Sequence, residues 1–414
     1  MGNYAGTALT TGFKNVFVGY GAGKAANDDS YSVAIGYDAL VTDAASSGSI
    51  AIGYQALEDQ NTASSNNVAI GFQAAKNLDG GTDSVYVGFL AGGVGAITGG
   101  FNTCMGYSAG YALAGGASNV LIGKNAGVAI TDGQRNIAIG HSALAAANLG
   151  ESYNVAIGHG AMESETSGAD YCVAVGYAAL NLQDENVKNT AIGGLAGDSI
   201  EEGDGNTLLG YQAGAAIVGG DNNTAVGDQA FYGGTGSSNT MVGSDTGQTA
   251  TGNDNVCVGS SAGLVLGDGP GNVLIGRAAG AAMTVGDYNV AIGWNAYDGM
   301  TTADSNNNIS IGKNALGGST AAISNNIAIG QDSLHHASYG AAVINLAIGY
   351  GTGASITSGT RNVLIGHAAG GDQSSAADCT AVGYNTLKLA TGVRNTAFGV
   401  NAAVQVAAGT YNTA

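Results

Sequence analysis

The chain has 414 residues, including 73 glycines but one proline and one tryptophan, and its 30 acidic and 11 basic residues give a net charge of −19. This acidity argues against nucleic acid or anionic lipid as partners, because both repel a negative surface. The chain has no apolar run of about 18 residues and no basic segment followed by an apolar one. We therefore expect neither membrane insertion nor a signal peptide within it.

A short motif recurs along the whole chain: Asn, a β-branched residue, a small apolar residue, Ile or Val, Gly, often Tyr, any residue, Ala, and then Leu or Gly. Its central glycine returns every 16 to 19 residues, from Gly19 to Gly399. Such a repeat indicates one structural unit that buries its apolar side by stacking on copies of itself. We predict one continuous domain, residues 1–414, folded as an all-β parallel β-solenoid (β-roll) of about 24 coils.

Both ends of the chain fall inside a repeat. Gly2 begins the back half of one motif, and residues 412–414 form the front half of another. Solenoids normally end in atypical capping repeats, so this arrangement predicts either copies that join head to tail or a segment of a longer array. The residues of the predicted axial junction are Met1, Gly2, Asn412, Thr413 and Ala414.

Each motif begins with a short β-strand, for which Asn67 to Gly71 is a typical example. Val68 and Ile70 share one face of this strand, and Ala69 points to the other. Both faces are apolar in nearly every repeat, which is typical of a strand covered on both sides. We predict that one face closes the coil's own core and that the middle row packs against another chain. Members of this predicted interchain row are Phe17, Ala34, Ala51, Ala69, Leu121 and Ala138.

The asparagine that opens the strand is present in 18 of 23 repeats, among them Asn15, Asn67, Asn102, Asn119, Asn136 and Asn154. Stacked coils would align these side chains as an Asn ladder at a turn, with each amide bonded to backbone or to the next amide. Thr190, Thr207, Thr224 and Thr240 form a second short ladder that resembles those of ice-binding solenoids. They share a face with apolar residues, so we expect them in the core.

An aromatic row follows the central glycine and consists of Tyr20, Tyr37, Tyr54, Phe72, Phe89 and Tyr107. Rings stacked at the coil spacing are a candidate glycan face, as in an adhesin. An aromatic ladder that only stiffens the roll is the simpler interpretation, since same-face aromatic pairs are common in sheets.

The sequence offers little metal, cofactor or catalytic chemistry. His141 and His159 fall on adjacent coils, but no third ligand has matching spacing. The acidic loops 201–204 and 219–222 lack the nonapeptide of calcium β-rolls, so weak surface Ca²⁺ is the most we expect of them. We predict a protein that is not an enzyme and has no cofactor. The cysteines lie on the repeat as small buried residues, too far apart for disulfides: Cys104, Cys172, Cys257 and Cys379.

The motif SVAIGYDAL at residues 32–40 resembles the heads of YadA-like trimeric autotransporter adhesins and the NTAIGYQAG arrays of bacteriophage tail-fibre proteins. This resemblance covers the whole chain and implies left-handed rolls in which three chains lie side by side or intertwine. The chain has no heptad stalk, membrane barrel or chaperone domain, which favours a fibre segment or filament over an intact autotransporter.

We therefore expect a structural fibre that assembles with itself, laterally as a trimer and head to tail, outside the cell or on a virion. The alternative is a receptor-binding adhesin or a tail-fibre shaft that presents a binding tip. In that case a glycan on a host or neighbouring cell would be a second partner.

Overall fold

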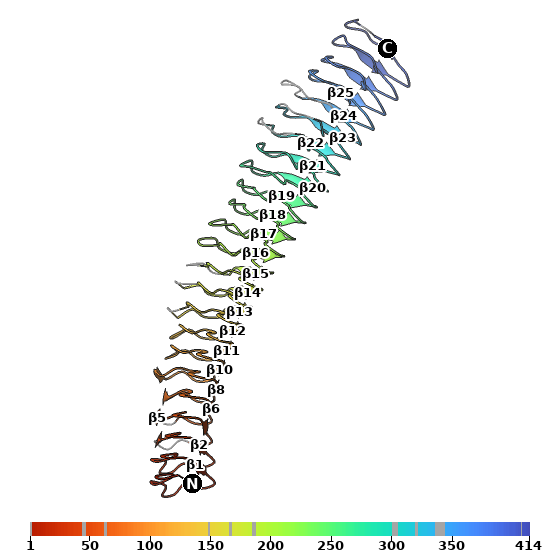
Figure 1. Ribbon diagram of the computed structural model, residues 1–414. Coiled ribbons are helices and arrows are strands. Elements are labelled where there is room, and N and C mark those ends of the chain that lie inside the picture. Colours follow the sequence, from red (N-terminus) through yellow and green to blue (C-terminus); the bar gives the residue numbers. More distant parts are fainter. Residues whose placement is uncertain are drawn as a thin grey trace. The chain divides into compact units, whose positions relative to one another are not determined.

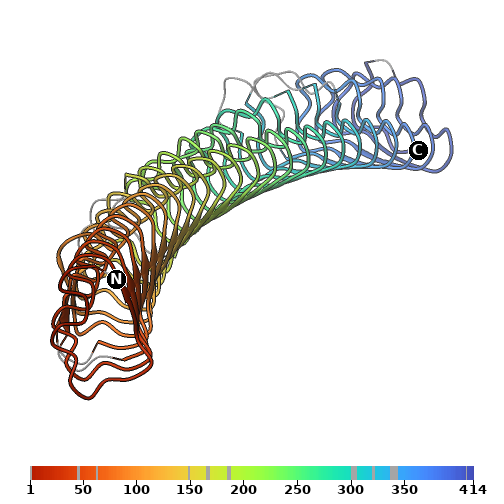
Figure 2. The same cartoon turned by 60° about the horizontal axis from the view of Figure 1, so that its bottom comes forward.

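The computed structural model describes residues 2–43, 47–61, 64–147, 150–164, 168–183, 188–299, 305–318, 322–335, 344–406 and 408–414. They fall into two compact units, Met1–Gly205 and Asn206–Ala414. Each unit is a stack of similar coils, with strands and turns but no helix among the described residues (Figures 1 and 2). The all-β parallel β-solenoid is confirmed, with about 21 to 24 coils of about 17 residues. The left-handed coil and the single domain stay predictions.

The first unit has one parallel sheet that takes one strand from each coil. Its strands are β1 (Val16–Val18), β2 (Val33–Ile35), β4 (Ile50–Ile52), β6 (Val68–Ile70), β8 (Val85–Val87), β10 (Thr103–Met105), β11 (Val120–Ile122), β12 (Ile137–Ile139), β13 (Val155–Ile157), β14 (Val173–Val175) and β15 (Thr190–Ile192). A smaller parallel sheet in the same unit contains β3 (Thr42–Asp43), β5 (Asp59–Asn61), β7 (Asn77–Asp79) and β9 (Ala96–Ile97).

The second unit repeats the main sheet. Its strands are β16 (Thr207–Leu209), β17 (Thr224–Val226), β18 (Thr240–Val242), β19 (Val256–Val258), β20 (Val273–Ile275), β21 (Val290–Ile292), β22 (Ile309–Ile311), β23 (Ile327–Ile329), β24 (Leu346–Ile348), β25 (Val363–Ile365), β26 (Thr380–Val382) and β27 (Thr396–Phe398). Within each unit, successive coils pair in register, so that each strand residue lies on its equivalent in the next coil, as Ala138 does on Ala156.

The central glycine is required by both its backbone conformation and its surroundings. Gly123 has a φ of +138°, and a Cβ added to it would lie 2.2 Å from the carbonyl oxygen of Gly140 in the next coil. Only glycine adopts this φ without strain, and no side chain fits against a backbone atom at that distance. The same glycine-on-glycine contact recurs along both units, which explains why the motif varies so little at this position.

The core of each coil lies between the strand and the segment that leads to the next strand, which we call the return segment. The middle strand residue and the residue six positions later meet there, and their sizes are reciprocal. Leu121 is followed by Gly127, where an added Cβ would lie 2.8 Å from the Leu121 Cδ2 atom. In the next coil, Ala138 is followed by Leu144, and both are fully buried. Most coils therefore hold one large residue of this pair, because the core has room for only one.

This reciprocity defines two kinds of coil. Those with the large residue on the strand contain the pairs Tyr86 and Gly92, Leu121 and Gly127, Leu208 and Gly214, Met241 and Gly247, Leu274 and Gly280, and Leu364 and Gly370. Those with the large residue six positions later contain, among others, Ala34 and Leu40, Ala51 and Leu57, Ala174 and Leu180, Ala225 and Phe231, Ala291 and Tyr297, and Ala381 and Leu387. The same reciprocity is visible in the sequence when the repeats are aligned, although it was not predicted above.

The two kinds of coil should be interchangeable. We expect Leu121→Ala to lower the free energy of unfolding by about 2–5 kcal/mol through a cavity, and Gly127→Leu to lower it by about 1–3 kcal/mol through overpacking. The double variant recreates the Ala138 and Leu144 pair, whose leucine already has a φ of 52°, so it should recover most of the loss. Denaturant unfolding followed by circular dichroism would measure the free energy of unfolding of all three variants. If the loss in the double variant equalled the sum of the two single losses, the two kinds of coil would not be interchangeable.

Candidate interaction surface

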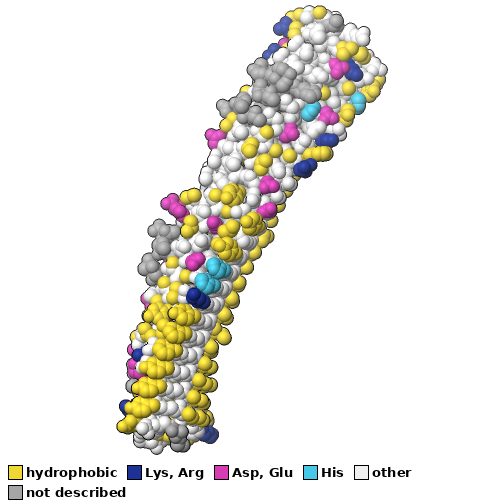
Figure 3. All heavy atoms as spheres, in the orientation of Figure 1, with side chains coloured by type: hydrophobic (Ala, Val, Ile, Leu, Met, Phe, Trp, Pro, Cys, Tyr) yellow, Lys and Arg dark blue, Asp and Glu magenta, His cyan; other side chains and the backbone are white. Residues whose placement is uncertain are grey.

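The first and third residues of the main-sheet strands form an apolar strip on the outside of each unit, which we call the outer ribbon. Val33 and Ile35 of β2 point outward, whereas Ala34 between them is fully buried. The same pattern, with a buried middle residue, holds for the other main-sheet strands from β4 to β27. Nearly every ribbon residue is Val, Ile, Leu or Thr and is partly exposed. Lines of hydrophobic side chains along the first unit are visible in Figure 3.

The structure corrects the predicted interchain row. Ala34, Ala51, Ala69, Leu121 and Ala138 are fully buried within their own chain, and Phe17 of β1 is half-buried. They belong to the coil's own core, and the five fully buried members cannot form a contact between chains. Alternation along a strand shows which residues share a face but not which face points inward. The narrow core decides this, because it admits small middle residues and leaves the larger β-branched residues outside.

The same inversion corrects the expectation for the threonine ladder. Thr207 is exposed and Thr190, Thr224 and Thr240 are half-buried, since all four are first residues of their strands and belong to the outer ribbon. They are not core residues.

The ladder asparagines are buried at the corner that precedes each strand, and they link successive coils. The Oδ1 atom of Asn119 accepts a hydrogen bond from the backbone N–H of Asn136 at 2.9 Å. Its Nδ2 atom donates to the carbonyl of Gly133 at 2.8 Å. Asn102, Asn136 and Asn154 make the same pair of contacts with their next coils. Each amide thereby satisfies buried backbone groups at a corner where no strand pairing can do so.

The ladder also tolerates replacements that keep an acceptor. Asn67 bonds the N–H of Ser84 at 3.0 Å, and Ser84 in turn accepts from the N–H of Asn102 at 3.0 Å. Asn15 accepts from the N–H of Ser32 at 2.9 Å. A serine therefore serves as the acceptor, although it lacks the amide donor.

The aromatic row of the first unit is a continuous ring stack. The centroids of neighbouring rings from Tyr20 to Tyr107 are 5.0 to 5.3 Å apart, and the ring planes are within 10° of parallel. The six side chains are 41 to 51% exposed. Because each ring lies against the next, the ring faces that a sugar would stack on are largely covered, and mainly the edges face solvent. Glycan binding by this row stays a prediction.

The histidines join the same kind of stack. The rings of His141 and His159 lie 4.9 Å apart and 8° from parallel, and Tyr177 continues the stack. Among the residues that the structure describes, no group of three or more His, Cys, Asp or Glu side chains is arranged to hold a metal ion. Weak surface Ca²⁺ at the acidic loops stays a prediction.

Both junction segments lie in register with the repeat. A Cβ added to Gly2 would lie 2.2 Å from the carbonyl carbon of Gly19, so Gly2 occupies a central-glycine position. The N–H of Asn412 donates to Asn395 at 3.0 Å, which adds a rung to the Asn ladder, and Thr413 pairs with Thr396. The backbone N–H of Ala414 donates to the carbonyl of Thr396. Met1 lies outside the described residues, and joining of these segments between copies stays a prediction.

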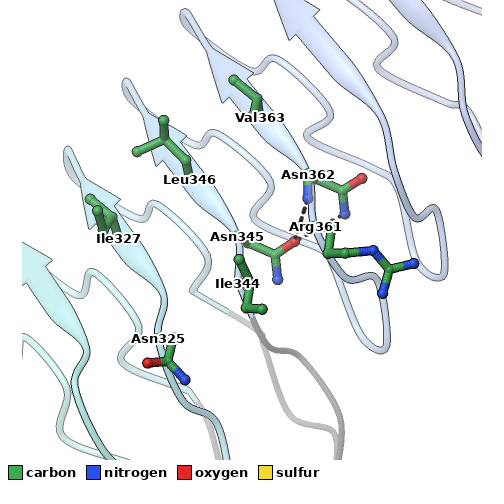
Figure 4. A pocket seen from close by; sticks show the side chains of 8 residues that line it. All are labelled: Asn325, Ile327, Ile344, Asn345, Leu346, Arg361, Asn362 and Val363. Carbon is green, nitrogen blue, oxygen red and sulfur yellow. Dashed lines mark hydrogen bonds between the residues drawn. The ribbon is translucent and has the colours of Figure 1, made fainter.

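A shallow depression lies beside the outer ribbon of the second unit (Figure 4). It is formed where ladder asparagines meet ribbon residues of β23, β24 and β25, and Ile344, which is 58% exposed, stands at its side. The residues that line it are Asn325, Ile327, Ile344, Asn345, Leu346, Arg361, Asn362 and Val363. The dashed lines in Figure 4 show Asn362 donating to Asn345, and both of these ladder asparagines are buried beneath the depression.

Comparison of the sequence with protein-family models and with curated protein sequences finds no match. The interpretation of this surface therefore depends on its own geometry. No helix among the described residues has the length and hydropathy needed to cross a membrane.

The Asn ladder gives a graded stability test. Asn119→Leu would leave the N–H of Asn136 and the carbonyl of Gly133 buried without partners, and each should cost about 1–3 kcal/mol of unfolding free energy. Asn119→Ser keeps the acceptor, as Ser84 does, and should lose about half as much. Asn27→Leu is the matched control, because this exposed asparagine makes no contact of the ladder type and does not have a positive φ. Equal losses for all three variants in denaturant unfolding would contradict the role of the ladder.

The cysteines give a test of core burial with a defined pH dependence. All four are buried and none forms a disulfide, and burial raises the pKa of the Cys104 and Cys257 thiols to about 12. At pH 8 a disulfide reagent should therefore modify no thiol of the folded chain and four of the unfolded chain. The thiols of the unfolded chain ionise near pH 9.0. The contribution of the buried thiols to the free energy of unfolding should therefore be complete below that pH and decline as the pH rises toward 12. Rapid modification of Cys104 in the folded chain would contradict the predicted burial.

Proposed function

We propose that the chain is a structural fibre protein whose β-solenoid associates laterally, as a trimer, and extends head to tail into a filament. The outer ribbon is the observation that carries this proposal. It is an apolar strip two residues wide, and it borders the exposed ring stack in the first unit. A soluble chain rarely leaves such a continuous apolar surface uncovered, and large exposed patches mark interaction sites.

A second copy of the chain fits the ribbon because both have the same repeat. Any partner that covers the ribbon along its length must match side chains that recur once per coil, at about the 4.8 Å spacing of paired strands. Another copy meets this condition at every coil. Lateral association would then bury the ribbon residues that the chain itself leaves half-exposed, such as Ile122, Ile139 and Ile157.

Stiffness along the axis follows from the way the coils are joined. Within each unit, backbone hydrogen bonds connect each coil to the next both in the strands and outside them, as from the N–H of Gly110 to the carbonyl of Ala126 at 2.9 Å. The Asn ladder and the ring stack add side-chain contacts in the same direction. Head-to-tail growth would extend this network between copies through Gly2 and residues 412–414. A rigid element of this kind suits an extracellular, cell-surface or virion fibre.

The alternative is an adhesin or tail-fibre shaft that presents a binding tip, with the row from Tyr20 to Tyr107 as a glycan-binding surface. The exposure of these rings supports it, and their mutual stacking argues for a stiffening role instead. Binding of the chain to a glycan array, lost when Tyr20, Tyr37 and Tyr54 are changed to serine, would favour this alternative.

The ribbon proposal is tested by its own residues. The triple variant Ile122→Gln, Ile139→Gln and Ile157→Gln should dissociate the lateral assembly, raising the dissociation constant at least about tenfold, a loss of about 1.4 kcal/mol. The control Leu182→Gln, Val218→Gln and Val265→Gln changes apolar residues that are 38 to 49% exposed outside the ribbon. Sedimentation would measure association, and electron microscopy would show filaments. Unaltered chains that remain single at every concentration would refute lateral assembly.

A further inference from the structure

The charged side chains are sorted between different sides of the coil. Two rows border the outer ribbon, and we call them the basic margins. One consists of the residues that precede the ladder asparagines, or the serine or cysteine that replaces them, and these residues have positive φ, such as Arg135 at 56°. The other is the row that follows the central glycines. Together they hold eight of the 11 Lys and Arg residues but only four of the 30 Asp and Glu residues. The rest of the chain has three cations and 26 carboxylates, so the ribbon side alone is positive.

The margin cations are exposed, and most of them make no ion pair within the chain. Those before the ladder asparagines are Lys14, Arg135, Lys188, Arg361 and Arg394, and those after the glycines are Lys124, Arg277 and Lys313. Arg361 and Arg394 pair with Asp378; among the described residues, the other six make no ion pair. Arg277 and Lys313 instead hold the Trp294 ring between them, at 5.7 and 4.7 Å from its centroid.

The exposed carboxylates gather on the return segments, across the core from the ribbon. Leu121 of β11 and Ile130 of the return segment approach the same point of the core near Gly127, so these two segments have the core between them. Exposed acidic residues on return segments include Asp28, Asp132, Glu202 and Asp268. The margins hold four cations and one carboxylate in the first unit, and four cations and three carboxylates in the second. The contrast between a basic-bordered apolar side and an acidic side is therefore strongest in the first unit.

This sorting constrains how two copies meet. Ribbon against ribbon is an isologous contact, in which the same surface lies on both sides. It would bring the positive margins of both copies together and leave every return segment unpaired. A heterologous contact sets the basic margins of one copy against the acidic return segments of the next, so that opposite charges meet. Such contacts close into a ring or continue as an open array.

We propose that the lateral contact between copies is heterologous, with the basic margins of one chain against the acidic return segments of its neighbour. This inference rests on the lateral association proposed above. It identifies the return segments of the neighbouring copy as the surface that the ribbon side contacts.

Complementation between two charge variants tests the inference. The margin variant is Lys124→Glu, Arg277→Glu and Lys313→Glu, and the edge variant is Asp132→Lys, Glu202→Lys and Asp268→Lys. Each should associate with itself at least about tenfold more weakly than the unaltered chain, because like charges then face each other. An equimolar mixture of differently tagged variants should regain association as mixed species, since each supplies the surface that the other has lost.

A matched control separates the local contact from net charge. Lys24→Glu, Lys76→Glu and Lys388→Glu changes the three cations outside the margins and alters the net charge as much as the margin variant does. Because these lysines lie on the return segments, which the basic margins of a neighbouring copy would face, this variant should associate at least as strongly as the unaltered chain. Thermal unfolding would verify that all variants fold.

A second measurement uses the unaltered chain. Carbodiimide joins an amine directly to a touching carboxylate, and a mixture of ¹⁴N- and ¹⁵N-labelled chains identifies links between copies. We expect links from Lys124 or Lys313 to return-segment carboxylates of another copy. The heterologous contact would be overturned if the mixture of the margin and edge variants associated no better than either variant alone. It would also be overturned if the control variant associated as weakly as the margin variant. Lateral assembly itself would survive both outcomes. An unaltered chain that never associates would overturn both proposals.

Discussion

The hydrogen bonding of each coil to the next is the constraint on which the rest of the structure depends. Parallel pairing in register places every side chain on its equivalent in the next coil. A residue type that is repeated in the sequence therefore becomes a column of touching side chains. The Asn ladder, the ring stack and the glycine contacts all arise in this way, and each would lose its contacts if a coil shifted register by one residue.

A narrow core is the second constraint, and it determines the surface. Most coils hold one large residue of the core pair, on the strand as in Leu121 or six positions later as in Leu144. The β-branched residues on either side of the middle position have no place inside and form the outer ribbon. The surface proposed for assembly is thus a consequence of how little the core can contain. Different residues pack the core and form the outer ribbon.

The polar parts of the coil complement these apolar ones. The ladder asparagines satisfy buried backbone groups at the corner, while charged residues are absent from the core pair and are divided between the margins and the return segments. A net charge of −19 therefore misrepresents the ribbon side, which is locally positive. For a chain of repeats, the charge of each row is a better guide to its partners than the total.

The sequence by itself determined the periodic fold, the strand positions, the asparagine and aromatic columns and the burial of the cysteines, because each depends only on the repeat period and on residue type. Only the tertiary structure decided which face of the strand points inward. Alternation placed Ala34 opposite Val33 and Ile35 but did not reveal that the alanine faces the core, and the predicted interchain row was inverted for that reason. The decision depends on the width of the closed coil, which brings Leu121 against position 127 and Ala138 against Leu144, and that width arises only when residues six positions apart meet across the core.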